Sequence, residues 1–170
     1  MNAFDGGPDM NSINQAVEEY TEQLKSGRIR EAYRGIMSFM SGLKAFMERL
    51  HPDLAFSALY PGYMDMTYFA CTPPALKEKG LKIAIVYLHE ENRFELWLSG
   101  SNKKIQAEYI SLLQTRDTGG CKLSQSKPGV DSILETRLPD QPDFDHAKDL
   151  MERIEREALR FMEITGQLIS

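Results

Sequence analysis

Apolar residues recur at helical spacing in two long segments near the start of the chain. The first segment, residues 12–27, opens on a capping box that Ser12 forms with Gln15, and its apolar positions then repeat every three or four residues. The second segment, residues 29–50, repeats in the same way until the chain breaks before Pro52. We therefore predict two consecutive helices.

Two further helices are predicted in the second half of the chain. One begins near Asn102, and we expect it to turn four side chains inward: Ile105, Tyr109, Leu112 and Leu113. The other is capped by Asp143 or Asp145 and carries an apolar stripe on an otherwise charged segment. The stripe consists of Ala147, Leu150, Met151, Ile154, Ala158, Phe161 and Met162.

The middle of the chain has the periodicity of β-strands. Residues 54–60 and 63–71 predict two strands joined by a turn at Pro61, and the apolar run within residues 82–89 is typical of a central strand covered on both faces. Residues 93–98 alternate strictly between apolar and other side chains. This alternation places Phe94, Leu96 and Leu98 on one face and Arg93, Glu95 and Trp97 on the other.

These elements predict an α+β fold with a mainly antiparallel sheet. Residues 122–125 and 132–138 add a weaker hairpin around Pro128, so that we expect about five or six strands, packed by the N-terminal and C-terminal helices. Residues 1–10 show no period and are interpreted as a disordered leader. Residues 11–170 are predicted to form a single domain.

Composition and charge narrow the class of protein. The 170 residues are 42% hydrophobic and 26% charged, and no apolar run is long enough to span a bilayer. The formal net charge of -5 argues against nucleic acid and anionic membranes as partners. The first residues lack the pattern of a secretion signal, and Cys71 and Cys121 form no disulfide or zinc motif, so we predict a cytoplasmic protein.

Strong catalytic fingerprints are absent from the sequence. It contains no GxGxxG, Walker A, HExxH, GxSxG or CxxC motif, and its three histidines lack the spacing of metal ligands. We therefore predict no cofactor and no metal. The sequence does not decide whether the protein is an enzyme.

The first candidate site lies in the predicted hairpins, where aromatic and ionisable residues gather. A polar-aromatic pocket for a small molecule is one interpretation, and an edge-strand salt bridge beside a packed tryptophan is the other. His89 ends an apolar strand beside an acidic residue, and a histidine there either exchanges protons or caps a turn. The candidate ligand-binding residues are Tyr60, Tyr63, Asp65, Tyr68, Tyr87, His89, Arg93, Glu95 and Trp97.

The second candidate site is the junction between the last of these strands and the helix that follows. Free backbone N–H groups and two lysines meet there, which is the chemistry of an anion site, although a solvated face explains two lysines equally well. The candidate anion-binding residues are Ser101, Asn102, Lys103 and Lys104.

A third candidate concerns assembly. The helix over residues 29–50 is rich in methionine and aromatic residues on more than one side, so it is either central to the core or partly turned toward a partner chain. The alternative function is therefore a noncatalytic protein that forms homo-oligomers through this helix or through a sheet edge.

The runs 56–69, 89–98 and 102–106 resemble an uncharacterised family of small bacterial cytosolic proteins, a domain of unknown function. This resemblance implies a bacterial origin and transfers no activity, cofactor or catalytic residue. A more distant similarity to restriction-endonuclease-like domains would make Asp65 and Glu95 acidic ligands of a metal-dependent hydrolase or nuclease, with His89 nearby. That pattern is broken because Trp97 stands where the motif has lysine. We keep this hydrolase as a third functional hypothesis.

Overall fold

The computed structural model describes residues 12–170, so the predicted leader over residues 1–10 lies outside the described part. The pattern of internal contacts divides the chain into two units, with the boundary in the sequence between Ser38 and Phe39. The prediction of a single domain over residues 11–170 therefore stays a prediction. The first unit holds α1 (Ile13–Ser26) and the start of α2 (Ile29–Leu50). The Ser12 hydroxyl accepts a hydrogen bond from the Gln15 backbone N–H at 3.2 Å, which confirms the predicted cap.

The second unit is built on a six-stranded antiparallel sheet, so the predicted α+β class is confirmed. Its strand order is β1-β2-β3-β4-β6-β5, and every pair of neighbours is antiparallel. The strands are β1 (Ala55–Phe56), β2 (Met66–Thr72), β3 (Leu81–Leu88), β4 (Arg93–Gly100), β5 (Lys122–Leu123) and β6 (Ser132–Arg137).

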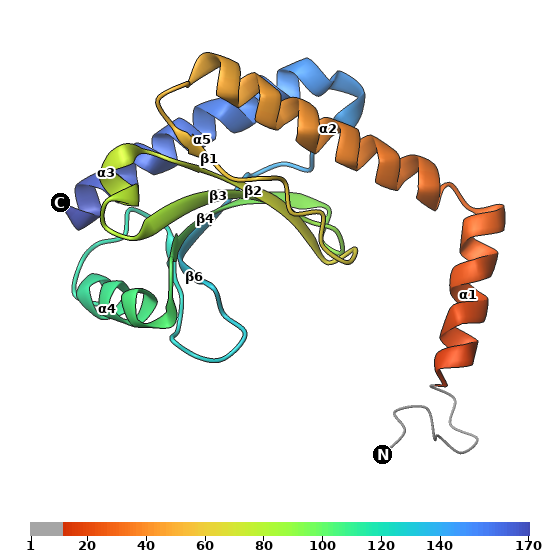
Figure 1. Ribbon diagram of the computed structural model, residues 1–170, viewed down its shortest axis with the longest axis horizontal. Coiled ribbons are helices and arrows are strands. Elements are labelled where there is room, and N and C mark those ends of the chain that lie inside the picture. Colours follow the sequence, from red (N-terminus) through yellow and green to blue (C-terminus); the bar gives the residue numbers. More distant parts are fainter. Residues whose placement is uncertain (1–11) are drawn as a thin grey trace. The chain divides into compact units, whose positions relative to one another are not determined.

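Helices cover both faces of this sheet to different extents (Figure 1). They are the part of α2 from residue 39 onward, α3 (Pro74–Lys77), α4 (Lys103–Leu113), the short 3-10 helix η1 (Phe144–His146) and α5 (Ala147–Ile169). In Figure 1, α5 lies along one face of the sheet and α4 lies by the other. The first face therefore carries the main core, while the second face is only partly covered.

Strand alternation sorts the side chains between these two faces. Ile83 and Ile85 point to the α5 side together with Phe94, and all three are at most 1% exposed. Phe94 packs against the rings of Phe39 and Phe144, with centroids 5.8 Å and 6.2 Å away. The predicted apolar face of residues 93–98 is thereby confirmed, and β3 is a central strand as its apolar run predicts.

The first predicted strand is largely wrong, because only Ala55 and Phe56 of residues 54–60 pair as a strand. The ladder is interrupted when the hydroxyl of Ser57 accepts the Ala70 backbone N–H at 2.8 Å. Side-chain bonds of this kind compete with regular pairing. The segment returns to the sheet at a single bridge between Tyr60 and Tyr68, which sets the position of Tyr60 beside β2.

The inward face predicted for the helix after Asn102 is partly wrong. Gln106, Ile110 and Leu113 are its buried residues, whereas Leu112 is 41% exposed. Successive helical residues point about 100° apart, and Leu113 takes the core position here while Leu112 turns to the surface. Gln106 takes an inward position because its amide reaches two backbone carbonyls, that of Val130 before β6 and that of Ser132 at the start of β6.

Candidate functional site

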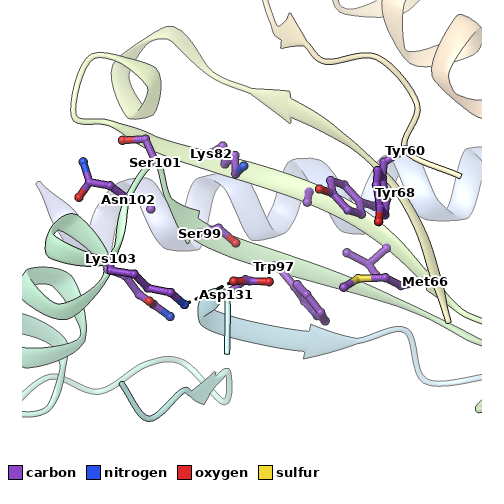
Figure 2. A pocket seen from close by; sticks show the side chains of 14 residues that line it. Tyr60, Met66, Tyr68, Lys82, Trp97, Ser99, Ser101, Asn102, Lys103 and Asp131 are labelled. Carbon is purple, nitrogen blue, oxygen red and sulfur yellow. Dashed lines mark hydrogen bonds and ion pairs between the residues drawn. The ribbon is translucent and has the colours of Figure 1, made fainter. Parts of the chain in front are cut away.

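A pocket of about 430 Å³ lies on the face of the sheet opposite α5 (Figure 2). Three strands provide its floor, and the N-terminal end of α4, the residue before β6 and the segment before β2 provide its walls. The lining residues are Tyr60, Met66, Tyr68, Lys82, Ala84, Val86, Trp97, Ser99, Gly100, Ser101, Asn102, Lys103, Gln106 and Asp131.

The floor follows from the two-residue period of the strands. Lys82, Ala84 and Val86 are alternate residues of β3, so they share one face, and antiparallel pairing sets Trp97 beside Ala84 and Ser99 beside Lys82. The small side chains at positions 84 and 99 leave room above the sheet that larger residues would fill. A hollow therefore forms where β3 and β4 run together.

The pocket has an aromatic end and a polar end. In Figure 2, Tyr60, Tyr68 and Met66 gather on the right, and Ser101 and its neighbours at the start of α4 gather on the left. The rings of Tyr60 and Tyr68 lie 4.9 Å apart between centroids with 36° between their planes. Trp97 lies between the two ends. A ligand that spans the pocket would meet rings at one end and hydrogen-bonding groups at the other.

The polar end holds two lysines with different surroundings. The Lys103 ammonium donates to the Val130 carbonyl at 2.7 Å and lies 3.4 Å from the Asp131 carboxylate. The Lys82 ammonium has no hydrogen bond or ion pair with any residue in the range 12–170. The charges that line the pocket are thus one matched pair and one unmatched cation.

Two side chains hold the wall before β6 against α4. The Gln106 amide donates to the carbonyls of Val130 and Ser132 at 2.7 Å and 3.1 Å, and Lys103 shares the first of these acceptors. Because Gln106 is only 2% exposed, these bonds replace the water that both carbonyls would otherwise bind. This anchoring keeps Asp131 at the pocket.

The phenol of Tyr68 is held in its neutral form. Burial raises its pKa above the ordinary value, and the nearby Tyr60 and Asp131 raise it further. A neutral phenol both donates and accepts hydrogen bonds. Tyr68 therefore offers a polar contact as well as a ring at the aromatic end.

With this geometry established, comparison with known proteins places the chain in a family. A family model described as a domain of unknown function, DUF7000, matches residues 13–168. The chain belongs to the DUF7000 family. Neither the curated proteins nor the solved structures contain a match to it. The resemblance to an uncharacterised family is thus confirmed.

Six of the sequence-predicted site residues line the pocket of this DUF7000 chain, and seven lie elsewhere. Those in the lining are Tyr60, Tyr68, Trp97, Ser101, Asn102 and Lys103. Those outside it are Tyr63, Asp65, Tyr87, His89, Arg93, Glu95 and Lys104. The structure therefore brings the two candidate sites together at one hollow, but with a smaller set of residues from each.

The predicted cluster of Arg93, Glu95 and Trp97 exists as a hydrogen-bonded group with a buried carboxylate at its centre and two half-buried partners. Glu95 is 3% exposed, and its two carboxylate oxygens accept from the Arg93 guanidinium at 2.9 Å and from the Trp97 indole at 2.8 Å. The carboxylate is fully occupied by these neighbours and does not line the pocket. Its effect on the site is indirect, because it fixes the orientation of the Trp97 ring.

Tyr87 and His89 face the other side of the sheet. The Tyr87 ring packs against Phe94 at 5.1 Å between centroids, and its hydroxyl donates to the Asn92 side chain at 2.8 Å. His89 Nε2 lies 2.8 Å from the Thr67 hydroxyl, which in turn lies 2.7 Å from the Pro61 carbonyl. Because that hydroxyl has one hydrogen, donated to the carbonyl, Nε2 of His89 is the donor to Thr67.

The remaining predicted residues are at the surface. The Asp65 carboxylate accepts the Tyr63 backbone N–H at 2.8 Å in a tight turn, and this bond lowers the pKa of Asp65. Tyr63 is 87% exposed, and Lys104 is exposed and does not line the pocket. Within residues 12–170, no group of three or more histidine, cysteine, aspartate or glutamate side chains is placed to hold a metal ion.

The structure adds Lys82 and Ser99 to the candidate site, and the sequence pattern carries a weak signal for both. Lys82 begins an otherwise apolar strand, and Ser99 continues the alternation of Glu95 and Trp97 by one more step. Parity along β4 therefore puts Ser99 on the Trp97 face, and parity along β3 puts Lys82 on the same face as Ala84 and Val86. Their side-by-side placement depends on the strand register, which the sequence pattern does not reveal.

The pH dependence of stability tests the environment of His89. Burial lowers its pKa below the ordinary value of 6.5, and the Asp65 charge only partly opposes this effect. The unfolded chain therefore takes up the proton first, so the free energy of unfolding should fall as the pH drops below 6.5 and stay unaffected above it. Denaturant titrations between about pH 5 and pH 8 should show this fall in the free energy of unfolding. In the His89→Gln variant the fall should be smaller.

His146 supplies the matched control. Its exposed ring is paired with Asp143, which raises its pKa, so its contribution to stability is present at low pH and lost as the pH rises. The His146→Gln variant should change the slope in the opposite sense. An unchanged slope in His89→Gln would contradict the assigned environment.

Proposed function

We propose that this DUF7000 domain binds a small molecule with an aromatic ring in the pocket above β3 and β4. The observation that carries the proposal is the lining itself, where two tyrosines face a group of polar side chains across a hollow of about 430 Å³ and Trp97 lies between them. Small-molecule sites commonly combine an aromatic or apolar lining with a few convergent polar groups. The alternative interpretation, a structural ion pair beside a packed tryptophan, accounts for the burial of Glu95 but not for the presence of the pocket.

The proposed ligand rings stack against Tyr68 and Trp97. Both side chains are partly exposed and both lie on the same face of the sheet, while Ala84 and Val86 form an apolar base between them. Offset contacts between rings are stabilising beyond the area that they bury. The indole is held by Glu95 before a ligand arrives, so little rotational freedom would be lost on binding.

We further propose a cytoplasmic location for this binding domain. Cys71 and Cys121 are both free and buried, and burial raises the pKa of the Cys71 thiol to about 12. Unpaired, unreactive thiols are the usage expected in a reducing compartment. In the part of the chain that the structure describes, no helix is both long and apolar enough for a membrane crossing.

Intrinsic fluorescence offers a direct test, because Trp97 is the single tryptophan of the chain and lines the pocket. A library of aromatic metabolites should contain compounds that change Trp97 emission and also raise the melting temperature. A ligand present at a hundredfold excess over its Kd stabilises the fold by about 2.7 kcal/mol. Trp97→Phe should lose the emission and reduce the thermal shift, because phenylalanine keeps a ring but lacks the N–H that Glu95 holds. Tyr68→Ala should weaken both responses.

The second candidate function, self-association, rests on one observation in the first unit. Ile13, Val17 and Tyr20 lie on one side of α1 at coiled-coil spacing, and each is at least 50% exposed. A melting temperature that no compound changes, together with a molar mass that rises with concentration in light scattering, would favour this function over ligand binding.

A further inference from the structure

We propose that the ligand carries a phosphate or carboxylate group and that Lys82 and Ser99 bind this anion at the polar end of the pocket. The inference rests on the proposed function, since it specifies the chemical class of the ligand for the same hollow. It adds a binding role for two residues of neighbouring strands that face each other across the β3–β4 ladder.

The unmatched charge of Lys82 is the first argument. A lysine on a pocket floor with no carboxylate partner in residues 12–170 leaves a net positive lining, although the whole chain has a net charge of -5. Asp131, the acidic residue of the lining, is matched by Lys103 at 3.4 Å. The pocket therefore attracts anions on a molecule that otherwise repels them.

The hydroxyl of Ser99 is the second argument, and it is independent of the first. Ser99 is only 5% exposed, yet no residue of the described chain forms a hydrogen bond with its side chain. In Figure 2 this hydroxyl points into the pocket, toward Asp131. No enclosed side-chain nitrogen or oxygen of the described chain lacks a hydrogen bond, so the Ser99 hydroxyl is open to the pocket rather than sealed in the protein. A hydroxyl that faces a pocket without a protein partner is available to donate a hydrogen bond to a ligand.

The start of α4 completes the anion site. Asn102 caps the helix by accepting the Ile105 backbone N–H at 2.9 Å, and both Asn102 and Lys103 line the pocket. The first N–H groups of a helix have no acceptor within the helix and favour a negative charge. Lys82, Ser99 and this helix start thus converge on the same end of the hollow.

Strand geometry sets the size of the ligand. Val86, which pairs with Tyr68, lies four residues from Lys82 along β3, and Ala84, which pairs with Trp97, lies two residues away. At about 3.3 Å per residue, the ring and the anion should be separated by roughly 7–13 Å. This distance fits an aromatic ring joined to its anion by a sugar or a short alkyl linker, and it excludes free phosphate as the complete ligand.

Calorimetric titration with matched pairs of compounds tests the inference. One pair is adenosine 5′-monophosphate and adenosine, the other is 4-phenylbutyrate and 4-phenylbutanol, and inorganic phosphate is the anion alone. We expect the charged member of at least one pair to bind about tenfold more tightly than its neutral counterpart, with an advantage that shrinks as salt is added. Inorganic phosphate should bind more weakly than the charged ring compound.

The variants Lys82→Gln and Lys104→Gln form a matched comparison, since both remove one charge from an exposed side chain but only Lys82 lines the pocket. Lys82→Gln should abolish the tenfold advantage of the charged compound, Lys82→Arg should retain most of it, and Lys104→Gln should leave it unchanged. Circular dichroism verifies that all three variants are folded. Ser99→Ala should lower the affinity for the charged compound more than the affinity for the neutral one.

Each other outcome overturns the inference. Equal affinity for charged and neutral compounds would reject the anion site but would not contradict the proposed aromatic pocket. If Lys82→Gln and Lys104→Gln lower the affinity for the charged compound equally, the advantage comes from general surface charge and not from the pocket. Absence of binding by all five compounds rejects the ligand class, and a flat response in the wider fluorescence and thermal screen would reject the proposed function as well.

Discussion

Replacing Phe94 by alanine is expected to lower the free energy of unfolding by about 3–5 kcal/mol, the largest loss among the changes considered for this chain. Phe94 is 1% exposed, and its ring packs against Phe39, Tyr87 and Phe144. Truncation removes the ring and leaves a cavity that these three neighbours fill only in part. Thermal and denaturant unfolding should both show the loss.

The Leu112→Ala variant is the control for Phe94→Ala. Leu112 is apolar as well but is 41% exposed, so its truncation should change the free energy of unfolding by less than about 1 kcal/mol. Phe94→Leu should fall between the two because it preserves part of the volume. A loss below about 1 kcal/mol in Phe94→Ala would contradict the placement of this ring at the centre of the core.

Replacing Gly62 by alanine is expected to cost about 2–4 kcal/mol and to disturb the aromatic end of the pocket. Gly62 has φ +72°, a left-handed conformation, and an added Cβ would lie 1.9 Å from the Met66 backbone oxygen. Because the obstacle is backbone, the turn itself must move. This turn connects Tyr60 to β2, so Gly62→Ala should also lower the affinity for any ligand that stacks on Tyr68.

The Gly120→Ala variant separates the cost of a left-handed backbone conformation from the cost of a steric clash. Gly120 also has a left-handed backbone, with φ +87°, but an added Cβ there meets no atom within 4 Å. Its replacement should therefore cost only the conformational strain, about 1–2 kcal/mol, and should leave ligand binding unchanged. Equal losses in the two variants would show that the Met66 carbonyl does not constrain the turn.

The binding predictions and the stability predictions depend on opposite faces of the same sheet. Phe94 belongs to the α5 face, whereas Lys82 and Trp97 belong to the pocket face. Residues on opposite faces of a strand share few contacts, so their substitutions should combine almost additively.

Much of the fold was predictable because local periodicity reports burial. The helices over residues 13–26 and 29–50 and the strands that contain residues 81–88 and 93–100 match their predicted segments closely. In each of them a single pattern is repeated often enough to outweigh local preferences. The strand at Ala55–Phe56 was overestimated, since at Ser57 the side-chain hydroxyl, and not the backbone carbonyl, accepts the Ala70 N–H and the regular pairing ends there.

Sequence alone determined that the face of β4 with Arg93, Glu95 and Trp97 is distinct from the apolar face, because alternation has only two possible outcomes. Only the tertiary structure decided which of these residues remain available to a ligand. Glu95 is occupied by its two neighbours, while Lys82 and Ser99 are brought together by the register of β3 and β4 and are left without partners in the described chain. Register and hydrogen-bond occupancy arise from contacts between segments distant in sequence, and no local pattern records them.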